Sequence, residues 1–194
     1  MTDGFKIEGQ GWAPQKALQY KPELEEFCRI VKREGVWNYL EIGSKWGGSF
    51  WHVGQVLPPG GKMVAVDLPQ FPEVKQSLKR CAAELRKRGL EVHTLFGDST
   101  DPAIVEKVYS LGPFDLCLID ANHTVQYVRA DWKNYGSIAR VVAFHDIAYG
   151  HGNRPQRYPI EVPQVWNEIK QGFAHTEIKL DPTGRDNGFG ILWH

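Results

Sequence analysis

The sequence predicts an α/β protein with a Rossmann-like, doubly wound and mostly parallel seven-stranded sheet that carries an antiparallel edge strand. Short apolar segments alternate with amphipathic ones along most of the chain, and strands that are separated by helices must pair in parallel. Near the C-terminus a polar turn joins two strands and permits antiparallel pairing. With 194 residues, of which 42% are hydrophobic, we expect an N-terminal arm over 1–20 and a single domain over 21–194.

The first half of the chain begins with a helix, because Pro22 suits a first helical position and apolar residues then recur at helical spacing. Glycine and proline separate the segments that follow. The expected elements are a helix from Pro22 to the stop at Gly35, a strand at 39–42, a helix at 47–57, a strand at 63–67, a helix from Pro72 to Gly89 and a strand at 91–96.

The second half contains a continuous apolar run at 114–120 that ends in an acid, as expected for a central strand buried on both faces. The loop at 149–159 is rich in hydrogen-bonding side chains and is long enough to act as a lid. The other expected elements are helices at 101–109, 124–135 and 162–171 and strands at 138–144, 175–180 and 188–193.

The most informative motif is the strand that ends in Glu41 and continues into a glycine loop with Gly43, Gly47 and Gly48. Asp67 closes the next strand 24 residues after Gly43, which is close to the spacing that places a carboxylate on a ribose. The three glycines do not have the Gly-x-Gly-x-x-Gly spacing of a pyrophosphate site, and an acid beside the loop favours a cationic cofactor such as S-adenosylmethionine over NAD.

Five acidic residues lie at or just beyond the ends of different predicted strands. Parallel sheets bind ligands outside the carboxyl ends of their strands, so these acids are the first candidates for a site. A lone acid in such a place can instead cap the following helix. The five residues are Glu41, Asp67, Asp98, Asp120 and Asp146.

These motifs resemble those of class I S-adenosylmethionine-dependent methyltransferases. More narrowly, the runs 118–124 (LIDANHT) and 142–146 (VAFHD) resemble the macrocin O-methyltransferase and cephalosporin hydroxylase-like group. The similarity spans roughly residues 37–147. It implies that the cofactor is bound by Glu41, Gly43, Ser44, Gly47, Gly48, Ser49, Asp67, Leu68, Gly97, Asp98, Ser99 and Asp120.

The resemblance also implies a divalent metal, usually Mg²⁺, beside the transferable methyl group. Asp120 and Asp146 would be its ligands, and His145 stands where some relatives have an acid. An imidazole suits manganese, iron or zinc better than magnesium, so His145 is either a third ligand or a neighbour of the ligands. His123 matches a histidine that acts as general base on a hydroxyl group, together with Asp120.

The function expected from the sequence is therefore metal-assisted O-methylation of a small hydroxylated molecule such as a sugar. An NAD-binding oxidoreductase and a non-catalytic methyltransferase-like binding module are the alternatives. The 23 basic and 23 acidic residues balance, so we expect neither nucleic acid nor a membrane as partner. Because enzymes of the resembled group often form oligomers, a homo-oligomer is also compatible with the sequence. The three cysteines favour reduced thiols and a cytoplasmic protein.

Overall fold

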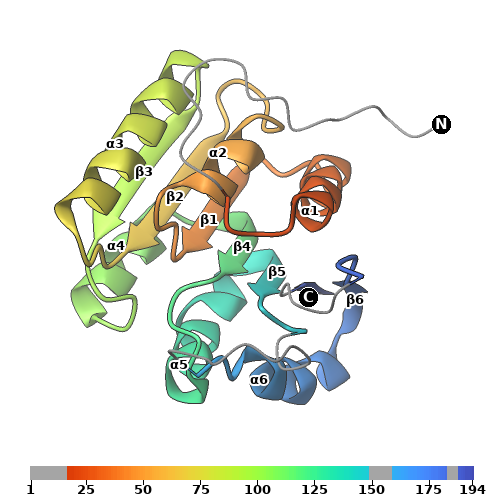
Figure 1. The fold of residues 1–194 in the computed structure, drawn as a ribbon. Helices are drawn as coiled ribbons and strands as arrows, with labels where there is room; N and C mark the ends of the chain where they lie inside the picture. The colour runs from red at the N-terminus through yellow and green to blue at the C-terminus, as the bar shows by residue number, and fades with distance from the viewer. Residues whose placement is uncertain (1–16, 149–158, 183–187) are drawn as a thin grey trace.

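A computed structural model describes residues 17–148, 159–182 and 188–194, and in them seven strands form one sheet in the order β3-β2-β1-β4-β5-β7-β6 (Figure 1). The sheet is parallel except at β7, which pairs antiparallel with both β5 and β6. The predicted fold class is confirmed, and the antiparallel strand lies one position inside the edge. The strands are β1 (Asn38–Ile42), β2 (Lys62–Asp67), β3 (Glu91–Phe96), β4 (Phe114–Ile119), β5 (Ala139–His145), β6 (Ala174–Ile178) and β7 (Phe189–Trp193).

Helices cover both faces of the sheet, with α1 to α3 in the upper part of Figure 1 and α5 and α6 in the lower part. Successive side chains of a strand point to opposite faces, so Tyr39 packs with α1 to α3 and Leu40 packs with α4 to α6. Both are fully buried. The helices are α1 (Lys21–Arg33), α2 (Gly48–Gly54), α3 (Pro72–Lys87), α4 (Pro102–Leu111), α5 (Val125–Tyr135) and α6 (Val162–Ile169), with short 3-10 helices at Gly136–Ile138 and Lys170–Gly172.

The predicted helix at 47–57 is shorter than expected, because α2 ends at Gly54. Residues 55–57 form turns instead, with the Val56 amide donating to Val53, and Pro58 disfavours a helical conformation in the residue before it. The other predicted elements begin and end within two residues of expectation. Residues 149–158 of the lid predicted at 149–159, and most of the arm at 1–20, lie outside the described residues.

The sheet reverses its strand order between β1 and β4, so the chain winds outward in both directions from this pair. Hydrogen bonds tie the residues that follow the central strands to one another: the Asp120 amide donates to Ile42 over 2.8 Å, and the Gly43 amide donates to Val66 over 2.8 Å. Ligands of doubly wound sheets bind at such a reversal. None of the helices in the described ranges is both long and apolar enough to cross a membrane.

Candidate functional site

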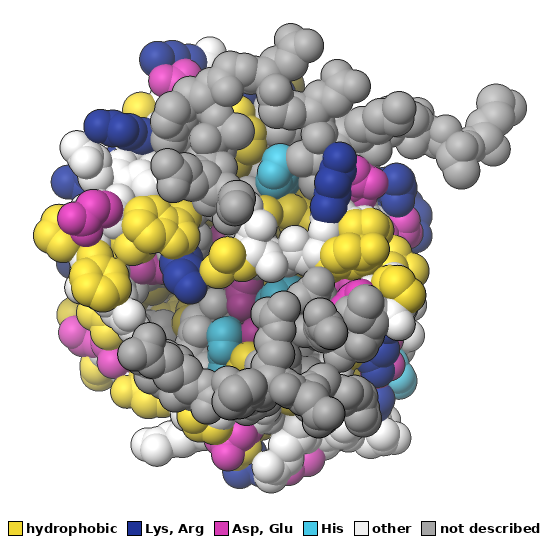
Figure 2. Space-filling view, in the orientation of Figure 1, with side chains coloured by type: hydrophobic (Ala, Val, Ile, Leu, Met, Phe, Trp, Pro, Cys, Tyr) yellow, Lys and Arg dark blue, Asp and Glu magenta, His cyan; other side chains and the backbone are white. Residues whose placement is uncertain are grey.

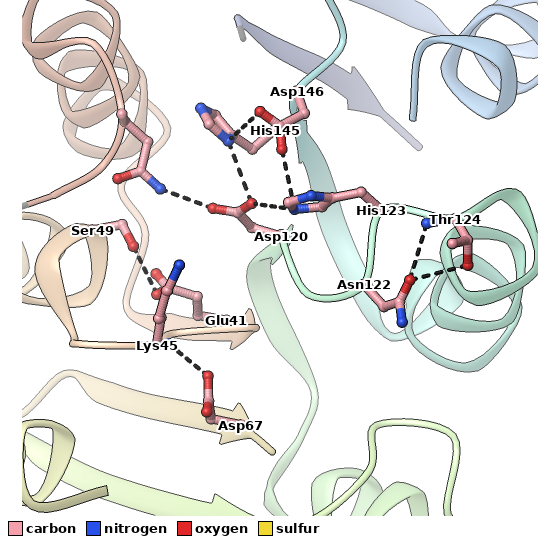
Figure 3. Close-up of polar contacts among 11 residues, drawn as sticks. Glu41, Lys45, Ser49, Asp67, Asp120, Asn122, His123, Thr124, His145 and Asp146 are labelled. Atoms are coloured by element: carbon pink, nitrogen blue, oxygen red, sulfur yellow. Dashed lines mark hydrogen bonds and ion pairs between the residues drawn. The ribbon is translucent and has the colours of Figure 1, made fainter. Parts of the chain in front are cut away.

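The predicted strand-end acids lie along one edge of the sheet, because β1 to β5 are parallel and their carboxyl ends point the same way. In Figure 2, acidic and histidine side chains are visible together near the centre of the face on which the carboxyl ends of the central strands lie. Figure 3 shows that the acids divide into a group around the glycine loop and a group at the ends of β4 and β5.

The glycine loop after β1 has a backbone that few side chains tolerate. Gly43 and Gly47 have φ values of 95° and 85°, and Lys45 between them also has a positive φ of 46°. A Cβ atom on Gly43 would lie 2.2 Å from the carbonyl oxygen of Asp120. The first glycine therefore allows the loop after β1 to pack directly against the end of β4.

Glu41, which was predicted to attract a cationic cofactor, is fully buried beneath the glycine loop. The hydroxyls of Tyr39 and Ser49 donate to its two carboxylate oxygens over 2.6 and 2.9 Å. Burial raises the pKa of Glu41 to about 7, against the effect of these hydrogen bonds. Through these hydrogen bonds the Glu41 side chain links β1 to the first turn of α2.

Asp67 at the end of β2 accepts a hydrogen bond from the Lys45 amide over 2.5 Å, so the acid predicted to hold a ribose also fixes the glycine loop. Burial raises the pKa of Asp67, and the hydrogen bond from Lys45 opposes that shift. The next residue, Leu68, is 62% exposed. An exposed apolar side chain beside a buried acid suits the mouth of a nucleoside site.

The third predicted cofactor segment, Gly97 to Ser99, forms a tight turn after β3. Asp98 accepts hydrogen bonds from the amide and the hydroxyl of Thr100, over 2.8 and 2.7 Å. The carbonyl of buried Ser99 accepts a hydrogen bond from Tyr135. Asp98 therefore stabilises its own turn, which is the local role that an isolated strand-end acid can have.

Four side chains at the ends of β4 and β5 form what we call the Asp-His cluster (Figure 3). Nε2 of His123 lies 3.5 Å from Oδ1 of Asp120 and 3.1 Å from Oδ2 of Asp146. Nδ1 of His145 lies 3.3 Å from Oδ1 of Asp120 and 3.2 Å from Oδ1 of Asp146. Each imidazole thus bridges the same two carboxylates.

The two imidazoles of the cluster differ in exposure, with 32% of the His123 side chain and 4% of the His145 side chain exposed. Burial lowers the pKa of His145, but the charges of Asp120 and Asp146 outweigh burial and raise it to about 9. Burial likewise raises the pKa of Asp120, and the facing histidines outweigh it and lower that pKa. The cluster therefore favours positive charge between its carboxylates.

Asp120, His123 and Asp146 each offer one metal ligand atom, and these atoms all lie within 4.8 Å of one another. Neighbouring ligands of an octahedral ion with bonds of ~2.1 Å lie ~3.0 Å apart, and the contacts of His123 with Asp120 and Asp146, at 3.5 and 3.1 Å, are close to this spacing. The predicted ligand set contained His145 in place of His123. The structure brings both histidines to the carboxylates, so their division of roles stays a prediction.

Gln19 is a residue of this site that was not predicted from the sequence. Its side-chain amide donates to Oδ2 of Asp120 over 2.8 Å. It lies just before α1 in an aperiodic stretch, and 101 residues separate it from Asp120. No sequence signal links two residues that far apart.

Comparison with known families identifies the class of protein. The chain matches a family model described as a methyltransferase domain over residues 40–147, which is more than half of its length. The matched stretch contains the glycine loop and the whole Asp-His cluster. The chain therefore belongs to this methyltransferase domain family, and the oxidoreductase alternative loses its support.

Solved structures agree with this assignment at the level of the fold. The O-methyltransferase TomG from Streptomyces achromogenes, solved with S-adenosylmethionine, has a TM-score of 0.70 at 21% identity, covering 93% of this chain and 82% of that chain. An O-methyltransferase from Bacillus cereus, solved with S-adenosylhomocysteine, has a TM-score of 0.67 at 18% identity, with 93% and 84% covered. A search of the curated proteins found no match.

Proposed function

We propose that the protein is an S-adenosylmethionine-dependent O-methyltransferase that uses a divalent cation, with Mg²⁺ as the expected ion, to methylate a hydroxyl group of a small molecule such as a sugar. One observation carries the proposal: the Asp-His cluster lies directly beside the glycine loop, where Gly43 packs against the Asp120 carbonyl. A methyl donor bound at the loop would present its sulfonium beside a site for a cation and a hydroxyl.

The residues around the loop suit the methyl donor. Asp67 ends β2 and lies 24 residues after Gly43, which is close to the spacing expected for an acid that holds a ribose. The turn at Gly97 to Ser99 lies after the neighbouring strand β3. The similar Bacillus cereus and Streptomyces enzymes were solved with S-adenosylhomocysteine and S-adenosylmethionine. We infer that the nucleoside extends from β1 toward β3, with its amino-acid end near Asp120.

The Asp-His cluster suits a divalent cation and proton transfer. Mg²⁺ prefers oxygen ligands, so Asp120 and Asp146 would hold it. When bound, the donor supplies a methyl group on a cationic sulfur, and the cation lowers the pKa of a hydroxyl in contact with it. His123 is the more exposed imidazole and would accept the hydroxyl proton, and the carboxylates that face its Nε2 atom would stabilise the resulting positive charge.

Methyl transfer from S-adenosylmethionine with a tritiated methyl group tests the proposal, using a panel of monosaccharides, polyols and phenols as acceptors. We expect incorporation that stops on chelation with EDTA and returns with Mg²⁺. Asp120→Asn should reduce the rate at least about 100-fold, whereas Asp101→Asn should not, because Asp101 is an exposed helix cap that asparagine can replace. Incorporation that is unchanged by EDTA would refute the role of the metal.

A further inference from the structure

Gln19 binds one carboxylate oxygen of Asp120, while the other carboxylate oxygen faces the two histidines of the Asp-His cluster. Its amide nitrogen holds Oδ2 at 2.8 Å, and Oδ1 faces the imidazoles of His123 and His145 at 3.5 and 3.3 Å. A carboxylate held in this way cannot rotate freely. Gln19 therefore fixes which oxygen of Asp120 is presented to the cluster.

The other end of the Gln19 amide has no partner within the described ranges. Its Oε1 is buried and accepts no hydrogen bond there. A buried amide oxygen without a donor costs about 1–3 kcal/mol, and native proteins rarely leave such groups unsatisfied. Because the same amide is anchored to the candidate active site, a bound molecule is a natural source of the missing donor.

Gln19 reaches Asp120 from the side of the glycine loop. Nearby Ala17 packs with the hydrophobic cluster that contains Phe50 of α2, the helix that follows the loop. His123 precedes α5, which packs on the opposite face of the sheet. Figure 1 shows the chain entering α1 below α2. The Gln19 amide therefore lies on the side of Asp120 that carries the glycine loop, where the methyl donor would bind, while His123 lies on the other side of Asp120.

The donor brings an ammonium group to this region, and Glu41 is not available to bind it. Both carboxylate oxygens of Glu41 are engaged by Tyr39 and Ser49, and the residue is fully buried. An ammonium group carries three hydrogen-bond donors and needs acceptors near the loop. The unpartnered Oε1 of Gln19 is such an acceptor, next to the negative charge of Asp120.

We propose that Gln19 is a donor-positioning residue, which orients Asp120 through Nε2 and accepts a hydrogen bond at Oε1 from the α-ammonium group of the methyl donor. The inference rests on the proposed function, since it requires S-adenosylmethionine at the glycine loop. It adds a recognition element from outside the matched methyltransferase stretch, which begins at residue 40.

Calorimetric binding of two probes to the full chain tests this role. S-adenosylhomocysteine carries the ammonium group, whereas 5′-methylthioadenosine keeps the nucleoside and the thioether but lacks the amino-acid end. Gln19→Met retains the length of the side chain without its hydrogen bonds. We expect it to weaken S-adenosylhomocysteine binding at least about tenfold and to leave 5′-methylthioadenosine binding unchanged. The matched control Gln171→Met, at an exposed position, should bind both probes like the wild type.

Gln19→Asn keeps the amide but shortens its reach, so the same selective loss is expected. Equal weakening of both probes would show a structural role for Gln19 and overturn the inference, as would unchanged binding of S-adenosylhomocysteine by Gln19→Met. Failure of the wild type to bind either probe would instead refute the proposed function itself. The two failures are thereby distinguished.

Discussion

The backbone of Gly43 lies so close to Asp120 that a Cβ atom at position 43 would come within 2.2 Å of the Asp120 carbonyl oxygen. This contact joins the glycine loop to the Asp-His cluster across the point where the strand order reverses. A carbonyl of the main chain cannot move aside as a flexible side chain can. The close approach of the glycine loop to the Asp-His cluster thus requires a residue without a side chain at position 43.

Gly43→Ala should therefore be damaging, since it combines this clash with an unfavourable φ of 95°. We expect a loss of about 2–4 kcal/mol in the free energy of unfolding, together with loss of S-adenosylhomocysteine binding. Denaturant titration and calorimetry measure the two effects. Gly172→Ala is the control, because nothing lies within 4 Å of its added Cβ, and a similar loss in that variant would refute the explanation.

The two cluster histidines should differ in their effects. If His123 is the base and the carboxylates hold the ion, His123→Gln should reduce the methylation rate about 10²–10⁴-fold and leave Mn²⁺ affinity, measured by electron paramagnetic resonance, within about threefold. The exposed His175 offers the control His175→Gln, for which neither quantity should change. A large loss of Mn²⁺ affinity in His123→Gln would make His123 a ligand instead.

Asp131 of α5 is predicted to make stability depend on pH. It is fully buried, and burial raises its pKa from 3.8 to about 7. Because the folded state binds the Asp131 proton more tightly than the unfolded state, the contribution of Asp131 to stability is fully present below pH 3.8. It is lost as the pH rises from there through about 7. The advantage of Asp131→Asn over the wild type should therefore grow by about 2–3 kcal/mol between pH 5 and pH 8. Urea unfolding at both pH values measures this difference, and exposed Glu106→Gln should show no such change.

Glu23 of α1 anchors the C-terminal strands. It is fully buried, and its carboxylate accepts hydrogen bonds from the amides of Leu180 and Gly188 over 2.7 and 3.1 Å. Glu23→Ala should lower the free energy of unfolding by about 2–4 kcal/mol, since buried amides lose their acceptor. Glu26→Ala on the same helix breaks a partly exposed ion pair with Arg29 and should cost at most ~1 kcal/mol. Equal losses in the two variants would contradict this role for Glu23.

The strand-end acids could be predicted from the sequence because parallel strands place their carboxyl ends on one edge. Asp67, Asp120 and Asp146 each follow an apolar run, and the alternation of strands and helices fixes the direction of every run. The same logic could not reveal that Glu41 turns inward to Tyr39 and Ser49.

Residues that act through long-range contacts could not be predicted. Gln19 lies in a stretch without a period, and Glu23 resembles an ordinary acid in the first turn of a helix. The first of the two strands predicted near the C-terminus extended to residue 180, but the Leu180 amide donates to Glu23 instead of to a neighbouring strand. Such contacts form only in the folded structure, because local sequence patterns do not show which distant residues a side chain will contact.

Calorimetric titration of the wild type with S-adenosylhomocysteine and, separately, with NAD⁺ tests most directly whether the glycine loop binds a methyl donor. We expect saturable one-to-one binding of S-adenosylhomocysteine, loss of that binding in Asp67→Ala, and no binding of NAD⁺. Saturable NAD⁺ binding without binding of S-adenosylhomocysteine would contradict the assignment of this site to methyl transfer.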